Sequence, residues 1–276
     1  MSEAHILCST DHHEMGIWAA WSLLRYLPQT RLVLHLDGAI PAGAAQQWSR
    51  IFPDARILTR RESLVLVEGR LANFGAVRRW TAAYYCGLKL GGFHAAALTD
   101  RLIEFDADTL VLRHPHVLLQ WLDQDAVRMR WNRDHRQCYA YPWRLVRDVV
   151  GNSIGPPPEL LNGGFILAQR MGDTDWAFLD DVLVRFDADP RTDPLRYWMH
   201  QTIAAVFAST LGEAARALPA DYAVSKGTTL ADTTMRHFAG HPDMRPRFFT
   251  EGVGLVIQDA IVQGHLPADF PQGPRT

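Results

Sequence analysis

Lysine is nearly absent from this sequence of 276 residues. Lys89 and Lys226 are the only lysines among 28 basic residues, and all the others are arginine. An excess of positive charge is also lacking, because 30 acidic residues give a net charge of -2. The composition therefore gives no reason to expect a nucleic acid as a partner.

Cysteine is scarce, and long apolar runs are missing. Cys8, Cys86 and Cys138 are widely spaced and odd in number, which argues against a disulfide framework or a paired-cysteine metal site. We expect them to be reduced thiols, buried as small apolar side chains, in a cytoplasmic protein. The N-terminus lacks the pattern of a secretory signal, and no stretch has the length of a membrane span. The sequence predicts no membrane-spanning segment.

The remaining composition is that of an ordinary globular chain, with 47% apolar and 21% charged residues. No linker, repeat or low-complexity segment divides it. We therefore expect one continuous domain over residues 1–276.

Strand and helix patterns alternate over the first hundred residues. Short β-rich runs occur at 5–9, 31–37, 56–59 and 102–105, and helical patterns separate them, the last over about 77–97. This order predicts an α/β fold with a central, mostly parallel sheet flanked by helices. Ligands of such sheets bind at the carboxyl ends of the strands, so Asp11 and the pair Asp106 and Asp108 should meet there. Later patterns predict a turn-rich loop at 151–160 that could cover the site, a strand at 161–170, and helices near 174–187 and 195–209.

Two aspartates interrupt the strand pattern LIEFDADTLVL. An extended backbone directs Asp106 and Asp108 to the same side, where their charges repel unless a cation or a proton lies between them. The other Asp-x-Asp copies, at 123–125, 173–175 and 187–189, adjoin helical patterns, and we interpret them as solvated helix ends. Paired carboxylates suit Mn²⁺ or Mg²⁺ with a diphosphate completing the shell. The first copy therefore predicts a metal site, with a solvated turn as the alternative.

Four sequence blocks carry a resemblance to a known family. They are ILCSTDHHEMG, LIEFDADTLVL, LNGGFIL and HFAGHPDMRPRF, and they span about residues 5–248. In this order they resemble the nucleoside segment, the metal-binding DxD, the sugar-pocket strand and the late His-Phe-x-Gly segment of GT-A nucleotide-sugar glycosyltransferases. The retaining glycogenin and lipopolysaccharide galactosyltransferase group is the most similar. The resemblance implies a single Rossmann-like GT-A domain, with a nucleotide-binding half at about 1–112 and a half for donor sugar and acceptor at about 113–276.

The resemblance also implies roles for individual residues. The metal ion, Mn²⁺ in preference to Mg²⁺, would be held by Asp106, Asp108 and His237. The nucleoside, its diphosphate and the attached sugar would be bound by Ser9, Thr10, Asp11, Lys89, Gly163, Gly164, Gly240 and Arg245, with the two neighbouring glycines leaving room for the sugar. The reaction centre would include Asn162, His200 and Gln201.

Two positions depart from the family pattern. His200 stands where relatives have an aspartate that holds sugar hydroxyls, although Gln201 beside it is retained. Gly87 stands where relatives have an arginine that touches the donor, and Lys89 could compensate. These departures leave the sugar of the donor open.

The function that the resemblance implies is the transfer of a hexose from a nucleoside-diphosphate sugar, UDP-hexose by family preference, with retention at the anomeric carbon. The acceptor stays open among a glycan, a lipid-linked sugar, a protein and a small molecule. FDADTL also resembles the nucleophile loop of haloacid dehalogenase-type phosphatases, with Asp106 as the nucleophile and Asp108 as the acid. That family needs a later lysine and an acidic pair, for which the chain offers Lys226 and Asp180 with Asp181. A protein that binds a sugar nucleotide without catalysis is the third possibility.

Overall fold

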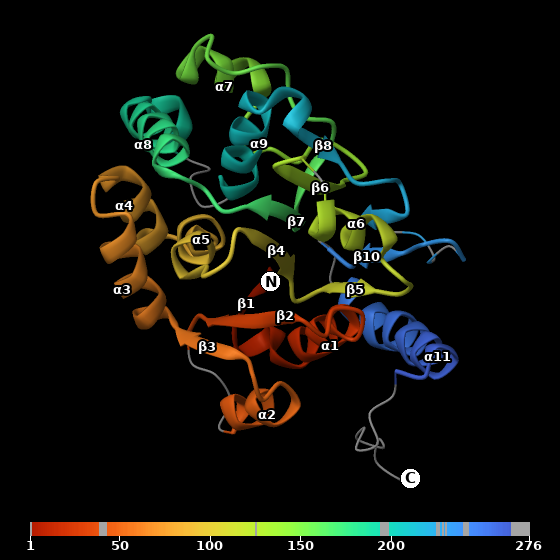
Figure 1. Ribbon diagram of the computed structural model, residues 1–276. Coiled ribbons are helices and arrows are strands. Elements are labelled where there is room, and N and C mark those ends of the chain that lie inside the picture. The colour runs from red at the N-terminus through yellow and green to blue at the C-terminus, as the bar shows by residue number, and fades with distance from the viewer. Residues whose placement is uncertain are drawn as a thin grey trace.

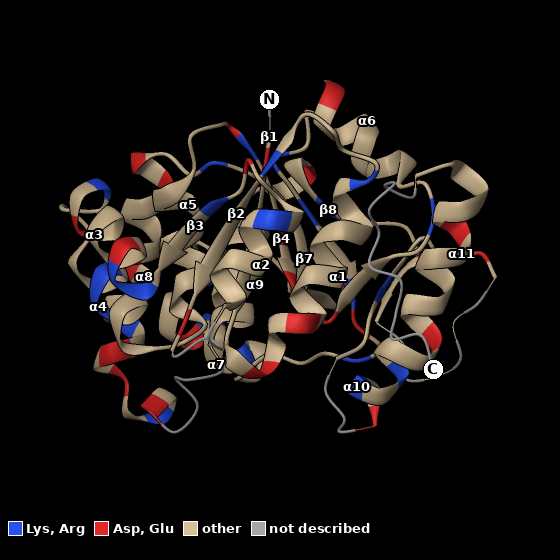
Figure 2. Ribbon diagram, turned by 90° about the horizontal axis from the view of Figure 1, so that it is seen from below, with Lys and Arg blue, Asp and Glu red and all other residues tan. Residues whose placement is uncertain are grey.

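The computed structural model describes residues 2–38, 43–124, 126–193, 199–224, 227, 229, 231–239 and 243–265. Within these ranges a sheet of ten strands runs through the centre of the molecule, and helices cover both of its faces (Figure 1). Lys and Arg are interspersed with Asp and Glu over the outer helices and loops, as the small net charge leads one to expect (Figure 2). None of the described helices combines the length and apolar character needed to cross a membrane.

The strands follow the order β3-β2-β1-β4-β7-β6-β9-β10-β5, and β8 pairs with β6. Their bounds are β1 Ser2–Cys8, β2 Thr30–Leu36, β3 Arg56–Thr59, β4 Arg101–Asp106, β5 Thr109–Val111, β6 Met129–Arg133, β7 Leu161–Gln169, β8 Ala215–Ala217, β9 Tyr222–Val224 and β10 Met235–His237. The first four strands of the order are parallel, and so are β6, β8, β9 and β10. Antiparallel pairing occurs where β7 lies between β4 and β6, and where β5 joins β10. The predicted α/β fold with a mostly parallel sheet is confirmed.

Helices connect these strands. The longer ones are α1 His13–Leu24, α2 Ala44–Ile51, α3 Arg60–Arg70, α4 Gly75–Ala83, α6 His116–Gln124, α7 Trp143–Val150, α8 Asp173–Ala188, α9 His200–Thr210 and α11 Gly254–Gln263. The shorter turns are η1 Thr10–His12, the π-helical η2 Leu88–Gly92, α5 Phe93–Ala96, η4 Gly212–Ala214, α10 Met244–Arg247 and the π-helical η5 Phe248–Val253. The helices α3, α7 and α11 were not anticipated from the sequence.

Successive side chains of a strand point to opposite faces of the sheet, and this produces two hydrophobic layers. Ile6 of β1 and Phe165 of β7 face one side, where they pack with α1, α2 and α6. Their neighbours Leu7 and Ile166 face the other side, in clusters with η2, α5 and the helices α4, α7, α8 and α9. The strands β1 and β7 therefore bury side chains on both faces, as expected for a sheet covered by helices on both sides.

The helix expected over 77–97 is interrupted in the structure. α4 ends at Ala83, and the chain turns before it resumes as η2. Gly87 lies against the backbone of Thr81, where an added Cβ would be 2.6 Å from the Thr81 Cα atom. No side chain fits there, which explains why this position holds glycine. The buried positions expected for cysteine hold for Cys8 and Cys86 but are wrong for Cys138, which is exposed on the loop after β6.

Candidate active site

Strand direction explains which polar residues meet at one edge of the sheet. β4 and β6 are both antiparallel to β7, so they run in the same direction. β9 is parallel to β6, and β10 is parallel to β9. The carboxyl ends of β4, β6 and β10 therefore reach the same edge of the sheet. Asp106 and His237 end β4 and β10 there, and Asp134 directly follows β6. β7 runs in the opposite sense, so its amino end brings Asn162 to the same edge.

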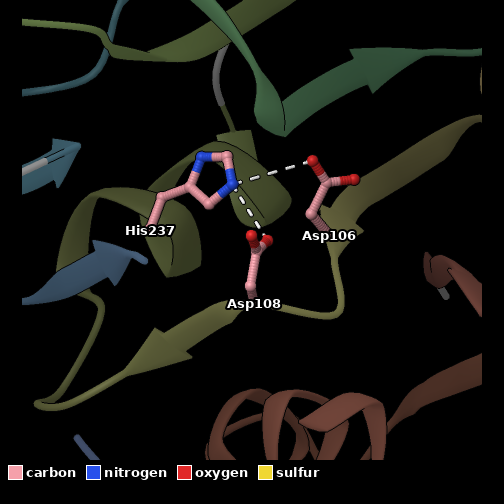
Figure 3. A group of neighbouring side chains, drawn as sticks. All are labelled: Asp106, Asp108 and His237. Carbon is pink, nitrogen blue, oxygen red and sulfur yellow. Dashed lines mark ion pairs between the residues drawn. The ribbon is translucent and has the colours of Figure 1, made fainter. Parts of the chain in front are cut away.

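Asp106, Asp108 and His237 form a compact cluster (Figure 3). The Nε2 atom of His237 is 2.9 Å from Oδ1 of Asp108 and 3.8 Å from Oδ2 of Asp106. Neighbouring ligands of an octahedral ion with bonds of about 2.1 Å lie about 3 Å apart, so the spacing fits a Mn²⁺ or Mg²⁺ ion. Among the described residues this is the only group of three such side chains that could hold a metal ion.

Backbone contacts fix the turn that carries the two aspartates. The Thr109 hydroxyl donates to the carbonyl oxygen of Asp106 at 2.7 Å, which closes the turn between β4 and β5. The amide of Phe238, just after β10, donates to the carbonyl oxygen of Asp108 at 2.8 Å. The late segment is therefore attached to the aspartate turn by its main chain as well as by His237.

Lys89 and His237 contact the carboxylates. Lys89 of η2 donates to Oδ1 of Asp106 and to the carbonyl oxygen of Gly163, both at 2.7 Å. Burial alone would lower the pKa of Lys89, but the Asp106 carboxylate raises it above its usual value. Burial would likewise raise the pKa of Asp108, yet His237 lowers it, and Asp108 in turn raises the pKa of His237 against the effect of burial. Each of the two aspartates thus has a basic side chain as a contact.

The strand β7 packs directly against the cluster. An added Cβ at Gly164 would be 2.1 Å from Cε1 of His237, so the imidazole fills the space beside this glycine. The donor sugar, for which the resemblance implies room at Gly164, would not lie on this side of the glycine. An added Cβ at Gly163 would meet Nε2 of His200 at 3.2 Å.

His200 and Gln201 begin α9 next to Gly163. Gln201 accepts from the Gly163 amide at 3.1 Å and donates to the carbonyl oxygen of Cys138 at 3.2 Å. Burial and the nearby Lys89 lower the pKa of His200 to about 3, so its imidazole is neutral, and its Nδ1 atom is buried without a hydrogen-bond partner. A cavity of about 30 Å³ lies beside it; its polar lining is Lys89, His94, Glu104 and His200.

The first-strand block reaches the late segment through a histidine. Ser9 lies 2.9 Å from Nδ1 of His12, and Nε2 of His12 lies 2.6 Å from the Arg245 guanidinium. Thr10 and Asp11 are exposed in η1 at the carboxyl end of β1. Gly240 lies outside the described residues.

The other Asp-x-Asp copies lie at the ends of helices. Asp123 lies in the last turn of α6, and its partner Asp125 is outside the described residues. Asp175 accepts from the Gly172 amide at the start of α8, and Asp189 pairs with Arg191 just after the end of that helix. Their interpretation as helix ends agrees with these contacts.

Sequence reasoning missed Asp134 and His12. Asp134 directly follows a strand, the same pattern that drew attention to Asp106, but without the direction of β6 nothing placed it at this edge. His12 lies inside a block that was recognised, and its contacts with Ser9 and Arg245 distinguish it from His13, which contacts Gln47 and Trp48.

Comparison with known proteins connects this geometry to a fold. No protein-family model matches the chain, and no curated protein matches it in sequence. Among solved structures, the galactosyltransferase LgtC with donor and acceptor sugar analogues is 13% identical, with a TM-score of 0.55 over 96% of this chain and 100% of that one. Mouse xyloside xylosyltransferase 1 is 14% identical, with a TM-score of 0.52 over 88% and 99%. The chain has the GT-A fold.

A third GT-A structure adds a bound metal and nucleotide to the comparison. Core-mannan synthase A from Aspergillus fumigatus, in its Mn/GDP form, is 11% identical, with a TM-score of 0.50 over 90% of this chain and 84% of that one. At these identities the likeness establishes the GT-A fold, and the function of this chain has to be argued from its own site.

Proposed function

We propose that this protein is a metal-dependent glycosyltransferase that moves a hexose from a nucleoside-diphosphate sugar to an acceptor. The observation that carries the proposal is the cluster of Asp106, Asp108 and His237 at the carboxyl edge of a GT-A sheet. This edge is where ligands bind in open α/β sheets, and the three side chains offer oxygen and imidazole ligands at a spacing that fits a divalent ion.

A bound Mn²⁺ or Mg²⁺ ion would supply positive charge to the diphosphate as the bond to the sugar breaks. Asp106, Asp108 and His237 would hold it, and the mixed carboxylate and imidazole set favours Mn²⁺. Three protein ligands leave positions for phosphate oxygens, as is usual for such ions.

Arg245 would bind the leaving diphosphate. Its guanidinium contacts His12, which in turn contacts Ser9 at the carboxyl end of β1. A guanidinium can chelate phosphate oxygens, and charge that develops on the leaving group strengthens this contact in the transition state. Thr10 and Asp11, exposed beside His12, would contact the nucleoside, for which we propose uridine, and Gly240 would let the backbone approach the diphosphate.

The donor sugar would lie over the amino end of β7 and α9. Gln201 is fixed there by Gly163 and by Cys138, and His200 presents a neutral imidazole beside Gly163. We propose retention at the anomeric carbon, with Gln201 near the reacting face. The acceptor belongs to one of the classes named above, a glycan, a lipid-linked sugar, a protein or a small molecule.

The contacts of the later acidic pair argue against the phosphatase alternative. Asp180 accepts from the amides of Ala76 and Val77 at the start of α4, and Asp181 pairs with Arg185 on α8. Both carboxylates are used in contacts between and within helices. The phosphatase reading therefore lacks the acidic pair that it requires.

Thermal unfolding with a panel of sugar nucleotides and Mn²⁺ tests the proposal. A donor that binds only the folded state should raise the unfolding temperature when Mn²⁺ is present and less so with chelator. That donor should then be hydrolysed slowly without acceptor, and nuclear magnetic resonance of a transfer product should show retained configuration. Cleavage of a generic aryl phosphate would instead favour the phosphatase, and binding without any turnover would favour a non-catalytic protein.

A further inference from the structure

We propose that Asn162 and Asp134 are positioning residues that hold His237 in the tautomer able to bind a metal ion. The inference rests on the proposed function in so far as His237 is a metal ligand. It gives Asn162 a role other than contact with the donor sugar, and it brings Asp134 into the site.

The orientation of the Asn162 amide follows from the chemistry of its neighbours. Its Oδ1 atom is 2.8 Å from the Gly164 amide nitrogen, which can only donate. Its Nδ2 atom is 2.8 Å from Oδ2 of Asp134, which as a carboxylate can only accept. If the amide were turned the other way, its NH2 group would face the Gly164 amide, which is also a donor, and its oxygen would face the Asp134 carboxylate, which is also an acceptor. Both contacts therefore select the same orientation.

This orientation decides where the proton of His237 lies. Nδ1 of His237 is 2.9 Å from Oδ1 of Asn162. Because that oxygen can only accept, Nδ1 carries the hydrogen and donates it. In a neutral imidazole the lone pair is then on Nε2, the atom that faces Asp106 and Asp108.

The hydrogen-bonded chain of Asp134, Asn162 and His237, here called the relay, is buried. Asp134, Asn162 and His237 are exposed by 7%, 5% and 4%. The second oxygen of Asp134 accepts from the backbone amide and from Nδ1 of His135, both at 2.7 Å. A hydrogen-bond acceptor behind a histidine ligand typically improves metal affinity about 10-fold to 100-fold, because it orients the ring and raises the basicity of the binding nitrogen.

Calorimetry of Mn²⁺ binding, with a nucleoside diphosphate that carries no sugar, separates the two roles of Asn162. Asn162→Ala should weaken Mn²⁺ binding by about 10-fold or more. If Asn162 served the sugar alone, the same variant would bind Mn²⁺ as the wild type does. The matched control is Asn132→Ala, since Asn132 is also a buried amide that accepts from a β7 amide, that of Phe165, but makes no hydrogen bond with His237.

Three further variants test the hydrogen bond between Asp134 and Asn162. Asp134→Ala removes the acceptor that fixes Nδ2, so the amide can turn and present a donor to His237; Mn²⁺ affinity should fall several-fold. Asn162→Asp places two carboxylates face to face and should also weaken binding. Adding Asp134→Asn to it restores one donor and one acceptor at each contact and should return the affinity to within about threefold of wild type.

The outcomes distinguish the inference from the function on which it rests. Thermal unfolding first verifies that each variant is folded, and Asp134→Ala serves if Asn162→Ala is not. Wild-type Mn²⁺ affinity in folded Asn162→Ala or Asp134→Ala would overturn the inference and leave the metal site intact. Wild-type protein that binds no Mn²⁺ with the nucleoside diphosphate would overturn the proposed metal site, and the inference with it.

Discussion

At the scale of single residues, the site is a set of compensating charges. Asp106 and Asp108 would repel each other, and in the structure Lys89 contacts the first while His237 contacts the second. A divalent ion would therefore enter a site where one carboxylate already has a fixed cationic partner. Metal binding should need the additional negative charge of the diphosphate, which makes the nucleotide part of the metal site.

The aspartate pair gives the most direct prediction at this scale. Asp106→Asn or Asp108→Asn should reduce Mn²⁺-dependent turnover of the donor by about 100-fold or more, because each removes a charged ligand. The double change Asp187→Asn with Asp189→Asn, in the second FDAD sequence, should leave turnover near normal. Steady-state rates measured with and without chelator check this. A folded but inactive protein with the second FDAD changed would show that the metal was assigned to the wrong copy.

Gly164 gives a steric prediction. Gly164→Ala would place a methyl group 2.1 Å from the present position of the His237 ring, so the imidazole must move. We expect Mn²⁺ affinity to fall by at least about 10-fold, as for loss of a ligand's support. Gly172→Ala is the control, because an added Cβ there meets nothing within 4 Å. Unchanged Mn²⁺ binding in Gly164→Ala, measured by calorimetry, would mean that His237 is free to shift without leaving the metal.

At the scale of elements, short segments position the functional groups. The break between α4 and η2 turns Lys89 towards the sheet edge, and β10 is only three residues long. Because side chains alternate along a strand, Arg236 lies on the opposite side of β10 from His237. The Arg236 guanidinium is fully buried and pairs with Glu251 of η5 at 2.5 Å, which attaches β10 to the last helices.

This ion pair gives a prediction about stability. Burial would raise the pKa of Glu251, but hydrogen bonds from Thr229 and Arg247 and the charge of Arg236 lower it to about 2. Glu251→Ala leaves the buried Arg236 without its carboxylate and should cost about 3 kcal/mol of unfolding free energy. Glu68→Ala breaks the more exposed pair with Arg78 and should cost less than about 1 kcal/mol. Denaturant unfolding at neutral pH compares the unfolding free energies of the two variants. Equal losses would contradict the stabilising role of the pair between Arg236 and Glu251.

At the scale of the whole molecule, polar groups are also buried away from the site. His35 lies inside the fold between His5, at 3.2 Å, and the Ser63 hydroxyl, at 3.0 Å. Burial lowers the pKa of His35 well below its usual value, and burial lowers that of His200 to about 3. The folded protein therefore keeps both imidazoles neutral in mild acid.

The fold should consequently lose stability below about pH 6.5, the usual pKa of histidine in an unfolded chain. Below that pH the unfolded state binds protons that the folded state does not, so stability rises with pH and falls with acid. Each such histidine contributes a slope of about 1.4 kcal/mol per pH unit. His35→Gln should flatten the pH profile of the unfolding free energy between pH 6.5 and 5, whereas His116→Gln, at an exposed position, should not. A profile for His35→Gln parallel to that of the wild type would contradict the buried neutral histidine.

The sequence by itself determined some of the elements and several of the groups that carry chemistry. Period-two and helical patterns are local, so they located β1, β2, β4 and β7 and showed why Asp106 and Asp108 differ from the other Asp-x-Asp copies. The order of strands and helices was enough to predict the α/β class and the mostly parallel sheet. The four ordered blocks led to the GT-A expectation, which the fold confirms.

Only the tertiary structure decided how distant groups combine. The antiparallel insertion of β7 brings Asn162 to the same edge as Asp134 and His237, and no local pattern specifies the direction in which a strand enters a sheet. The space beside Gly164 was expected to admit a sugar, yet it is filled by an imidazole more than seventy residues away in the chain. Hydrogen-bond partners and packed volumes depend on positions in space, whereas periodicity reports only which side of its own element a residue faces.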